Sequence, residues 1–226
     1  MNSVVNTPYK SYDVRFHHPS TILISGVSGT GKTHLTKQIL ENADNVFKPD
    51  PPKFVVLVYH TWQNIYQQMV DKGLINLCLK EIPDYESLKD ICSEYKDNSG
   101  ILLIIDDKLS GIDSHIVDIF CVYSHHLRIT VLLLVQTLFS SNKDFRHISL
   151  NSQYIFLMKN TRDSSSITHL AKQIFPYKTR FLTESYINAT KHPYSHLLLD
   201  LRQETESEIR VRANIFDEVV TVYTLK

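Results

Sequence analysis

Cysteine and net charge are both scarce in this sequence. The chain has 226 residues and three cysteines, Cys78, Cys92 and Cys121, and no two of them are spaced as CxxC. This odd, scattered set argues against a disulfide framework and against a structural zinc site. Lysine and arginine number 24, as do aspartate and glutamate, so the formal charge is zero. A small module that binds DNA by electrostatics alone would show a basic excess, so any contact with a polyanion must come from a local patch or from several subunits.

Long hydrophobic runs are absent as well. The longest, 101–105 and 131–135, fall far short of the roughly 20 residues that span a bilayer. Residues 1–16, MNSVVNTPYKSYDVRF, are polar and lack the apolar core of a secretory signal. We therefore expect a soluble, intracellular protein with no membrane partner.

Apolar segments of strand length alternate with segments of helical period along the chain. The expected strands are 21–25, 54–60, 101–106, 131–136, 153–158 and 196–201. The expected helices are 32–42, 62–69, 112–124, 164–174 and 180–190. Apolar runs without alternation favour strands covered on both faces. The pattern predicts one α/β domain over 19–216, with a mostly parallel central sheet flanked by helices. We expect an N-terminal arm over 1–18 and a C-terminal tail over 217–226.

Glycine is scarce too, but three of the six glycines lie between residues 26 and 31. The segment GVSGTGKT, residues 26–33, fits the phosphate-loop pattern GxxxxGK[ST] at every required position. Its glycines let backbone N–H groups face inward around the β- and γ-phosphates of a nucleotide. Lys32 adds a positive charge, the Thr33 hydroxyl can coordinate Mg²⁺, and the helix starting at Lys32 points its positive end at the phosphates. The predicted nucleotide-binding residues are Gly26, Val27, Ser28, Gly29, Thr30, Gly31, Lys32, Thr33 and His34.

Two adjacent acids end the apolar run 101–105. Asp106 is predicted to hold Mg²⁺ through water, from the strand beside the phosphate loop. Asp107, facing the γ-phosphate, is predicted to polarise the attacking water as a general base. Two adjacent acids suit hydrolysis better than the single acid of many kinases. The alternative is a solvated strand end capped by aspartates.

Gln136 ends the apolar run 131–135 in an amide. This amide could hydrogen-bond a γ-phosphate or the attacking water, and so report which nucleotide is bound. On its own, a glutamine at a strand end is also compatible with no function. The interpretation depends on the phosphate loop and the acidic pair that accompany it.

Together, GVSGTGKT, ILLIIDD and VLLLVQT resemble the FtsK–HerA branch of additional-strand P-loop ATPases, which have a RecA/ASCE-type domain. Their spacing is closest to the compact genome-packaging ATPases of poxvirus-like and Polinton/adintovirus-like DNA viruses. The segments 124–139, 148–163 and 192–201 add to the resemblance, which covers roughly 17–216. It implies an ATP-hydrolysing, Mg²⁺-dependent motor that forms a homo-oligomeric ring and moves double-stranded DNA into a preformed capsid. A capsid or portal protein would be its partner, in the host cytoplasm or nucleus or in the virion.

The resemblance also implies roles for individual residues. Lys32 and Thr33 would bind phosphates and Mg²⁺, Asp106 would hold the metal, Asp107 would be the base and Gln136 the sensor. Many relatives have Glu where this chain has Asp107, and the shorter side chain reaches the water less directly.

An oligomeric motor also needs an arginine that reaches the γ-phosphate in a neighbouring subunit. Arg162 is the first candidate and Arg128 the second; each is also compatible with a surface arginine, for example Arg162 paired with Asp163. The segment 140–151 is predicted to be a polar loop that either lines a DNA channel, touching phosphates, or is simply solvated.

Three other functions remain open. A nucleotide or small-molecule kinase would need an arginine-rich lid, which we cannot identify. A GTPase would need DxxG and NKxD motifs, and residues 160–163, NTRD, match the second only superficially. A binding module with a relic phosphate loop is disfavoured by the intact Lys32, Thr33 and Asp106.

Overall fold

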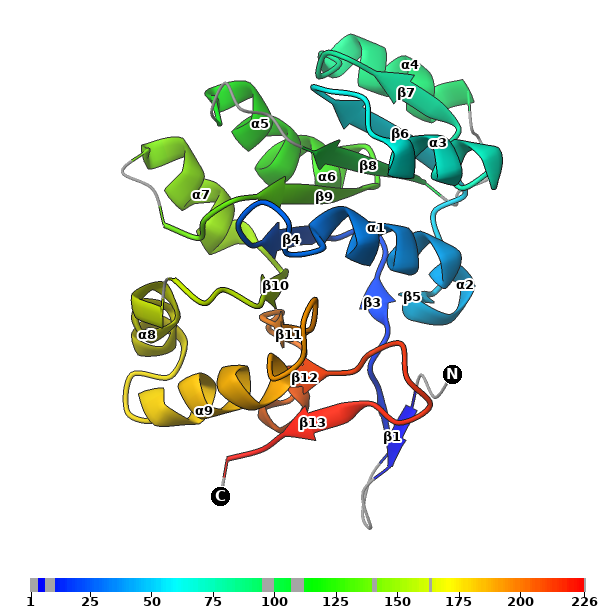
Figure 1. Cartoon of the computed structure of the whole chain (residues 1–226). Coiled ribbons are helices and arrows are strands. Elements are labelled where there is room, and N and C mark those ends of the chain that lie inside the picture. Colours follow the sequence, from blue (N-terminus) through cyan, green and yellow to red (C-terminus); the bar gives the residue numbers. More distant parts are fainter. Residues whose placement is uncertain are drawn as a thin grey trace.

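The computed structural model describes residues 4–6, 11–94, 100–106, 112–139, 142–162 and 164–225. Within this part of the chain, nine strands form one central sheet (Figure 1). Across the sheet they are β13 (Thr221–Tyr223), β12 (Val211–Ala213), β11 (His196–Asp200), β10 (Tyr154–Met158), β4 (Thr21–Ser25), β9 (Ile129–Val135), β8 (Ile101–Asp106), β6 (Phe54–Tyr59) and β7 (Leu77–Leu79). The strands from β10 to β7 are parallel, and β11, β12 and β13 are added in antiparallel pairing.

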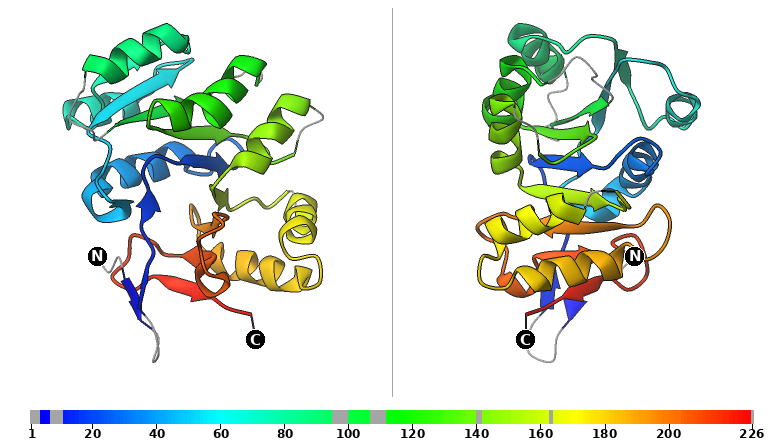
Figure 2. Two further views of the ribbon diagram at one scale, coloured as in Figure 1. Left: turned by 180° about the vertical axis from the view of Figure 1, so that it is seen from behind. Right: turned by 60° about the vertical axis from the view of Figure 1, so that its left-hand side comes forward.

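Helices cover both faces of this sheet, and Figure 2 shows the strands between two helical layers. One layer contains α1 (Lys32–Glu41), α2 (Ala43–Val46) and α3 (Asn64–Asp71). The other contains α4 (Tyr85–Glu94), α5 (Ser114–Asp118), α7 (Lys143–Asn151), α8 (Ser164–Ile174) and α9 (Thr179–Ala189). A π-helical turn (Ile119–Tyr123) and the short α6 (Ser124–His126) continue α5. No helix of the described residues is long and apolar enough to cross a bilayer.

The strand β4 shows why its apolar residues do not alternate with polar ones. Ile22 and Ile24 pack into the core under α1 and α3, whereas Leu23 packs into the core on the opposite face. Successive side chains of a strand point to opposite faces, so a strand with a helical layer on each side must be apolar throughout. The prediction of a mostly parallel sheet flanked by helices is confirmed.

The position of β9 corrects one expectation. The strand that ends in Asp106, β8, was expected beside the phosphate-loop strand, but β9 lies between them and pairs in parallel with both. The buried run Ile129–Leu134 allows this arrangement because β9 is covered on both faces and hydrogen-bonded at both edges. The carboxyl ends of β4, β9 and β8 therefore lie side by side at one edge of the sheet, which we call the loop edge.

Both terminal segments add strands to the fold. In the N-terminal segment, β1 (Val4–Asn6) pairs with β2 (Ser11–Asp13), and β3 (Phe16–His17) pairs with β5 (Phe47–Lys48). Phe16 is buried, with its ring against Phe47 and Tyr154. At the other terminus, β13 is the last strand of the large sheet. The boundaries of the domain at 19 and 216 stay a prediction.

A buried ionic cluster lies at the edge of the sheet opposite the loop edge. Asp200 Oδ1 accepts hydrogen bonds from Arg202 Nε at 3.0 Å and Thr205 Oγ1 at 2.8 Å. Its Oδ2 accepts from Nη2 of Arg202 at 2.9 Å and of Arg212 at 2.7 Å. Burial raises the pKa of Asp200, but the Arg202 hydrogen bonds and the charges of both arginines outweigh it, so the pKa lies below its ordinary value. Arg212 also donates to the carbonyl of Val14 at 2.8 Å, so the cluster connects β11 and β12 to the N-terminal segment.

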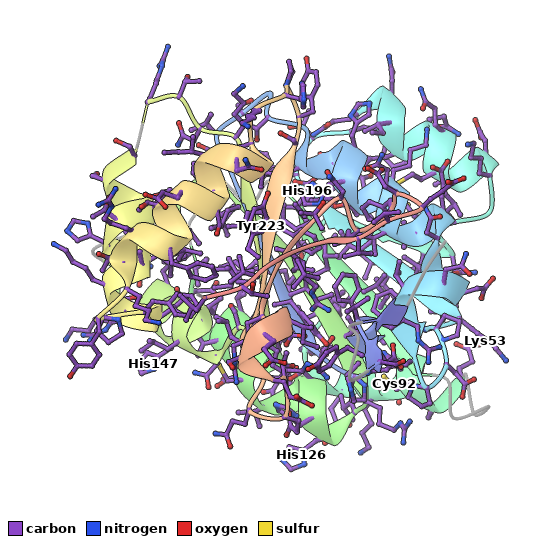
Figure 3. All side chains as sticks on the ribbon, turned by 90° about the horizontal axis from the view of Figure 1, so that it is seen from below. Lys53, Cys92, His126, His147, His196 and Tyr223 are labelled. Carbon is purple, nitrogen blue, oxygen red and sulfur yellow. The ribbon has the colours of Figure 1, made fainter. Side chains whose placement is uncertain are left out.

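The polar segment 140–151 is mostly helical, which corrects its prediction as a loop. Asn142 caps α7, because its side chain accepts a backbone hydrogen bond in the first turn at 2.8 Å. Phe145 and Ile148, three residues apart on one helix face, are buried and fix α7 against the sheet. The exposed side chains of α7 include Lys143, Arg146 and His147. Figure 3 shows His147 projecting outward at the rim of the molecule.

Candidate functional site

The phosphate loop joins β4 to the amino end of α1. Gly26 begins it, and its N–H donates to the carbonyl of Val135 on β9 at 3.1 Å. Gly29 and Gly31 have φ angles of 79° and 94°, in the left-handed region that side chains with a Cβ rarely adopt. Gly31 is also the N-cap of α1, and its carbonyl accepts from Leu35 N at 2.9 Å. The glycine spacing therefore wraps the loop around the positive end of a helix, which is an anion-binding arrangement.

Position 26 has room only for glycine. A Cβ added there would lie 2.6 Å from Met158 Cβ and 2.6 Å from Thr30 Oγ1. The strand β10 thus packs directly against the start of the loop. Any larger residue at this position would displace either the loop or β10.

Lys32 lies across the loop. Its Nζ donates to the carbonyl of Gly26 at 2.8 Å and to that of Val27 at 3.3 Å. The ammonium group and the amino end of α1 therefore concentrate positive charge at the same place. An anion bound by the loop would meet both.

Asp106 and Thr33 meet under the loop. Asp106 ends β8, is 4% exposed, and its Oδ2 accepts a hydrogen bond from Thr33 Oγ1 at 2.9 Å. Carboxylate and hydroxyl oxygens are ligands suited to Mg²⁺, which keeps several waters and takes only one or two protein oxygens beside substrate phosphates. The two predicted metal residues therefore fit such an ion. Asp107, the predicted base, lies outside the described residues.

Tyr66 is a partner of Asp106 that sequence reasoning missed. It is fully buried on α3, and its hydroxyl donates to Asp106 Oδ2 at 2.8 Å. No motif marks Tyr66, because the contact depends on β6, the strand before α3, pairing with β8.

Gln136 lies between the loop and Asp106. It follows β9, and the register pairs the preceding residue, Val135, with Ser25 at the end of β4. Its side chain is exposed and lines the same cavity as Lys32 and Asp106. The insertion of β9 is what brings this amide to the centre of the loop edge.

A cavity of 1290 Å³ is lined by Lys32, Thr33, Asp106 and Gln136 and extends beyond them. Gln63 and Asp106 line it on the β8 side of β4, whereas Tyr194 and Phe216 line it on the β11 and β12 side. His34, also predicted to bind nucleotide, is exposed and lines the cavity from the first turn of α1. The cavity is larger than a triphosphate needs, and the groups suited to phosphate and metal lie towards the β8 side.

The β11 side of the cavity is aromatic. Tyr194 is 69% exposed, has a φ of 61°, and its ring would lie 3.2 Å from a Cβ on Gly31. Behind it, His196 (labelled in Figure 3) packs between Phe156 and Phe216, at ring-centroid distances of 5.3 and 6.3 Å. Burial lowers the pKa of His196 to about 4, so its ring is neutral at pH 7. This side of the cavity is thus suited to a flat, uncharged group.

The two candidate arginines lie at opposite edges of the sheet. Arg162 follows β10 at the loop edge, is exposed, and its backbone N–H donates to Asn160 Oδ1 at 3.0 Å. Arg128 is exposed with a φ of 55° and precedes β9 at the far edge. Because a strand rises ~3.3 Å per residue, the length of β9 puts the backbone of Arg128 ~20 Å from the cavity of its own chain. Asp163, the alternative partner of Arg162, lies outside the described residues.

Comparison with known proteins identifies the fold. No family model and no curated protein matches the chain. The structure of the genome packaging NTPase B204 from Sulfolobus turreted icosahedral virus 2, in complex with ATP-γS, matches with 13% identity and a TM-score of 0.52, covering 91% of this chain and 97% of that chain. The cytoplasmic domain of the type VII secretion ATPase EccC from Thermomonospora curvata matches with 8% identity and a TM-score of 0.48, covering 92% and 24%. The chain therefore has the single-domain α/β NTPase fold of a viral genome-packaging NTPase, as its sequence motifs predict.

Proposed function

We propose that this chain is a Mg²⁺-dependent ATPase of the FtsK–HerA type, and that rings of it drive double-stranded DNA into a viral capsid. The observation that carries the ATPase proposal is the 2.9 Å hydrogen bond from Thr33 to Asp106. It joins the end of the phosphate loop to an acid two strands away, so a hydroxyl that can coordinate Mg²⁺ lies beside a carboxylate that can hold the ion through water.

Each group then has a distinct task. The loop N–H groups and Lys32 bind the β- and γ-phosphates and stabilise the charge that develops on them during transfer. Thr33 and Asp106 would hold a magnesium ion, which would supply positive charge to neutralise the phosphate oxygens. Asp107 accepts a proton from the attacking water, and Gln136 orients that water beside the γ-phosphate. The γ-phosphoryl group passes to water, leaving ADP and phosphate.

Two observations support DNA packaging as the purpose of hydrolysis. The first is the full-length match to a protein named as a genome packaging NTPase. The second is the position of Arg162, exposed at the loop edge, where it can meet the γ-phosphate of a neighbouring subunit in a ring. In the same ring, the basic side chains on the exposed face of α7 contact DNA phosphates. A capsid or portal protein would anchor the ring, and the runner-up function is a nucleotide or small-molecule kinase.

We expect linear double-stranded DNA to raise the rate of ATP hydrolysis several-fold at constant enzyme and Mg²⁺. DNA that occupies the ring favours the arrangement in which Arg162 completes the neighbouring site, so turnover rises. Phosphate release with and without DNA measures this. Arg180, 90% exposed on α9, offers the matched control: Arg162→Ala should abolish the stimulation, and Arg180→Ala should not.

Three results would count against the motor. DNA without effect on hydrolysis would remove the coupling, and a strict monomer by light scattering with ATP analogues would remove the ring. Transfer of the γ-phosphate to a nucleotide or small molecule instead of water would favour the kinase.

We expect Tyr194→Ala to weaken ATP binding about tenfold, because stacking of a base on an aromatic ring is worth about 1–3 kcal/mol. Phosphates bound at the loop leave the base on the aromatic β11 side of the cavity, where the exposed ring of Tyr194 borders Gly31. Binding of ATP and of inorganic tripolyphosphate, measured by calorimetry, separates the two ends of the site. Tripolyphosphate should bind both proteins equally, and Tyr177→Ala, at a 98% exposed ring, should change neither. Equal loss of both ligands would contradict the stacking role.

A further inference from the structure

Tyr66 belongs to an aromatic cluster between β6 and α3, together with Tyr59 and Trp62. The ring centroids lie 5.0 Å apart for Tyr59 and Trp62, 5.8 Å for Trp62 and Tyr66, and 6.0 Å for Tyr59 and Tyr66. Tyr66 is fully buried within it, whereas Trp62 is 42% exposed. A cluster that served packing alone could use phenylalanine at position 66.

The hydroxyl of Tyr66 lies in a short chain of hydrogen bonds that leads to the metal residues. It accepts from Gln63 Nε2 at 3.1 Å and donates to Asp106 Oδ2 at 2.8 Å. Gln63 is the N-cap residue of α3 and lines the nucleotide cavity. These hydrogen bonds therefore connect the cavity wall, through the buried hydroxyl of Tyr66, to the carboxylate of Asp106.

Two hydroxyls donate to the same oxygen of Asp106 from two different helices. Thr33 does so from α1 at 2.9 Å, and Tyr66 from α3 at 2.8 Å. A carboxylate with two fixed donors is held in one rotamer. In the proposed site Thr33 has a second task, since its oxygen would also coordinate Mg²⁺. Tyr66 has no such task and can hold the carboxylate throughout the cycle.

We propose that Tyr66 is a positioning residue for Mg²⁺, which orients the carboxylate of Asp106 through its hydroxyl and is itself oriented by Gln63. This rests on the proposed Mg²⁺-nucleotide site. Groups that orient a metal ligand through a hydrogen bond contribute about 10- to 100-fold to metal affinity. The effect of losing Tyr66 should therefore fall on the affinity for Mg²⁺, with the chemical step unchanged once the metal is bound.

The experiment compares Tyr66→Phe with Tyr59→Phe. Both keep the ring in the same cluster and remove one hydroxyl. The Tyr66 hydroxyl donates to the carboxylate of Asp106, whereas Tyr59 meets Asp106 through the pairing of β6 with β8. We expect Tyr66→Phe to raise the Mg²⁺ concentration for half-maximal ATP hydrolysis about tenfold. At saturating Mg²⁺, kcat should stay within about twofold of the wild type, and Tyr59→Phe should change neither quantity. Gln63→Leu should give a smaller shift, of about threefold, because it removes the donor to Tyr66 but leaves the hydroxyl.

A second readout does not need turnover. Trp62 is the single tryptophan of the chain and lies against Tyr66, so its fluorescence should change as Mg²⁺ is titrated into the ADP complex. The midpoint should move about tenfold in Tyr66→Phe, in step with hydrolysis. The same midpoint in both proteins would overturn the inference, as would a lower kcat at saturating Mg²⁺ with no shift in midpoint. If the wild type binds Mg²⁺-ADP but does not hydrolyse ATP, the ATPase proposal fails, and the fluorescence shift still decides the role of Tyr66.

Discussion

Lys32→Ala should lower kcat/KM for ATP at least about 100-fold, as expected when a preorganised electrostatic donor is removed from a transferring group. Lys32 contributes the charged side chain of the phosphate loop, and its Nζ is held over the loop by the carbonyls of Gly26 and Val27. Alanine keeps the start of α1 helical but leaves only backbone N–H groups to meet the phosphates. Phosphate release at saturating Mg²⁺ measures the loss. Lys89→Ala, on the exposed face of α4, is the matched control and should retain the wild-type rate.

Asp107→Asn distinguishes binding from chemistry in the same assay. Removal of a general base leaves the loop, Lys32 and the metal residues intact, so ATP affinity should stay close to the wild type while hydrolysis falls about 100-fold. A Lys32→Ala protein with the wild-type kcat/KM would overturn the ATPase proposal. A wild-type rate in Asp107→Asn would leave that proposal standing and remove only the base assignment.

The second large effect should come from Asp200→Asn, which is expected to cost about 3–5 kcal/mol of unfolding free energy. Asparagine has the same shape but no charge, so the buried guanidinium groups of Arg202 and Arg212 would face each other without a counter-charge. Urea unfolding followed by circular dichroism measures the change.

The cluster also predicts acid sensitivity. The pKa of Asp200 is lowered in the fold, so its contribution to the free energy of unfolding is complete above about pH 4. That contribution is lost as pH falls through the folded pKa.

The chain contains a matched control for this experiment. Asp13 and Arg15 have the same spacing as Asp200 and Arg202, and both pairs form bonds of 3.0 and 2.9 Å. The side chains of Asp13 and Arg15 are 35% and 33% exposed, against 0% and 7% in the buried pair. Exposed ion pairs contribute at most about 1 kcal/mol, so Asp13→Asn should destabilise the protein far less. Similar losses in the two variants would show that burial does not determine the effect.

The features that sequence predicted were those set by neighbouring residues. The loop between β4 and α1 is one, because its conformation depends on glycines only a few residues apart. The strands and most helices are others, since apolar period is a local property. The meeting of Thr33 with Asp106 could also be expected, because both residues are predicted to hold the same Mg²⁺ ion.

What the sequence could not show depends on which distant strands pair. The insertion of β9 beside β4 and the contact of Tyr66 with Asp106 both follow from strand order, which no local pattern encodes. The helix over Lys143–Asn151 was missed for another reason. Its polar residues resemble a loop unless Asn142 is recognised as a cap and Phe145 and Ile148 as one buried face.

The strand order also sets when the nucleotide site can form during synthesis. β4 ends at Ser25, but its two neighbours end at Val135 and Met158. At about 5–20 residues per second, roughly 7–27 s separate synthesis of β4 from synthesis of its second neighbour. Throughout this interval the phosphate loop lacks at least one of the two strands that flank β4. A nucleotide site at this loop would therefore be complete only after Met158 has been synthesised, so a nucleotide would not assist the earliest folding of the nascent chain.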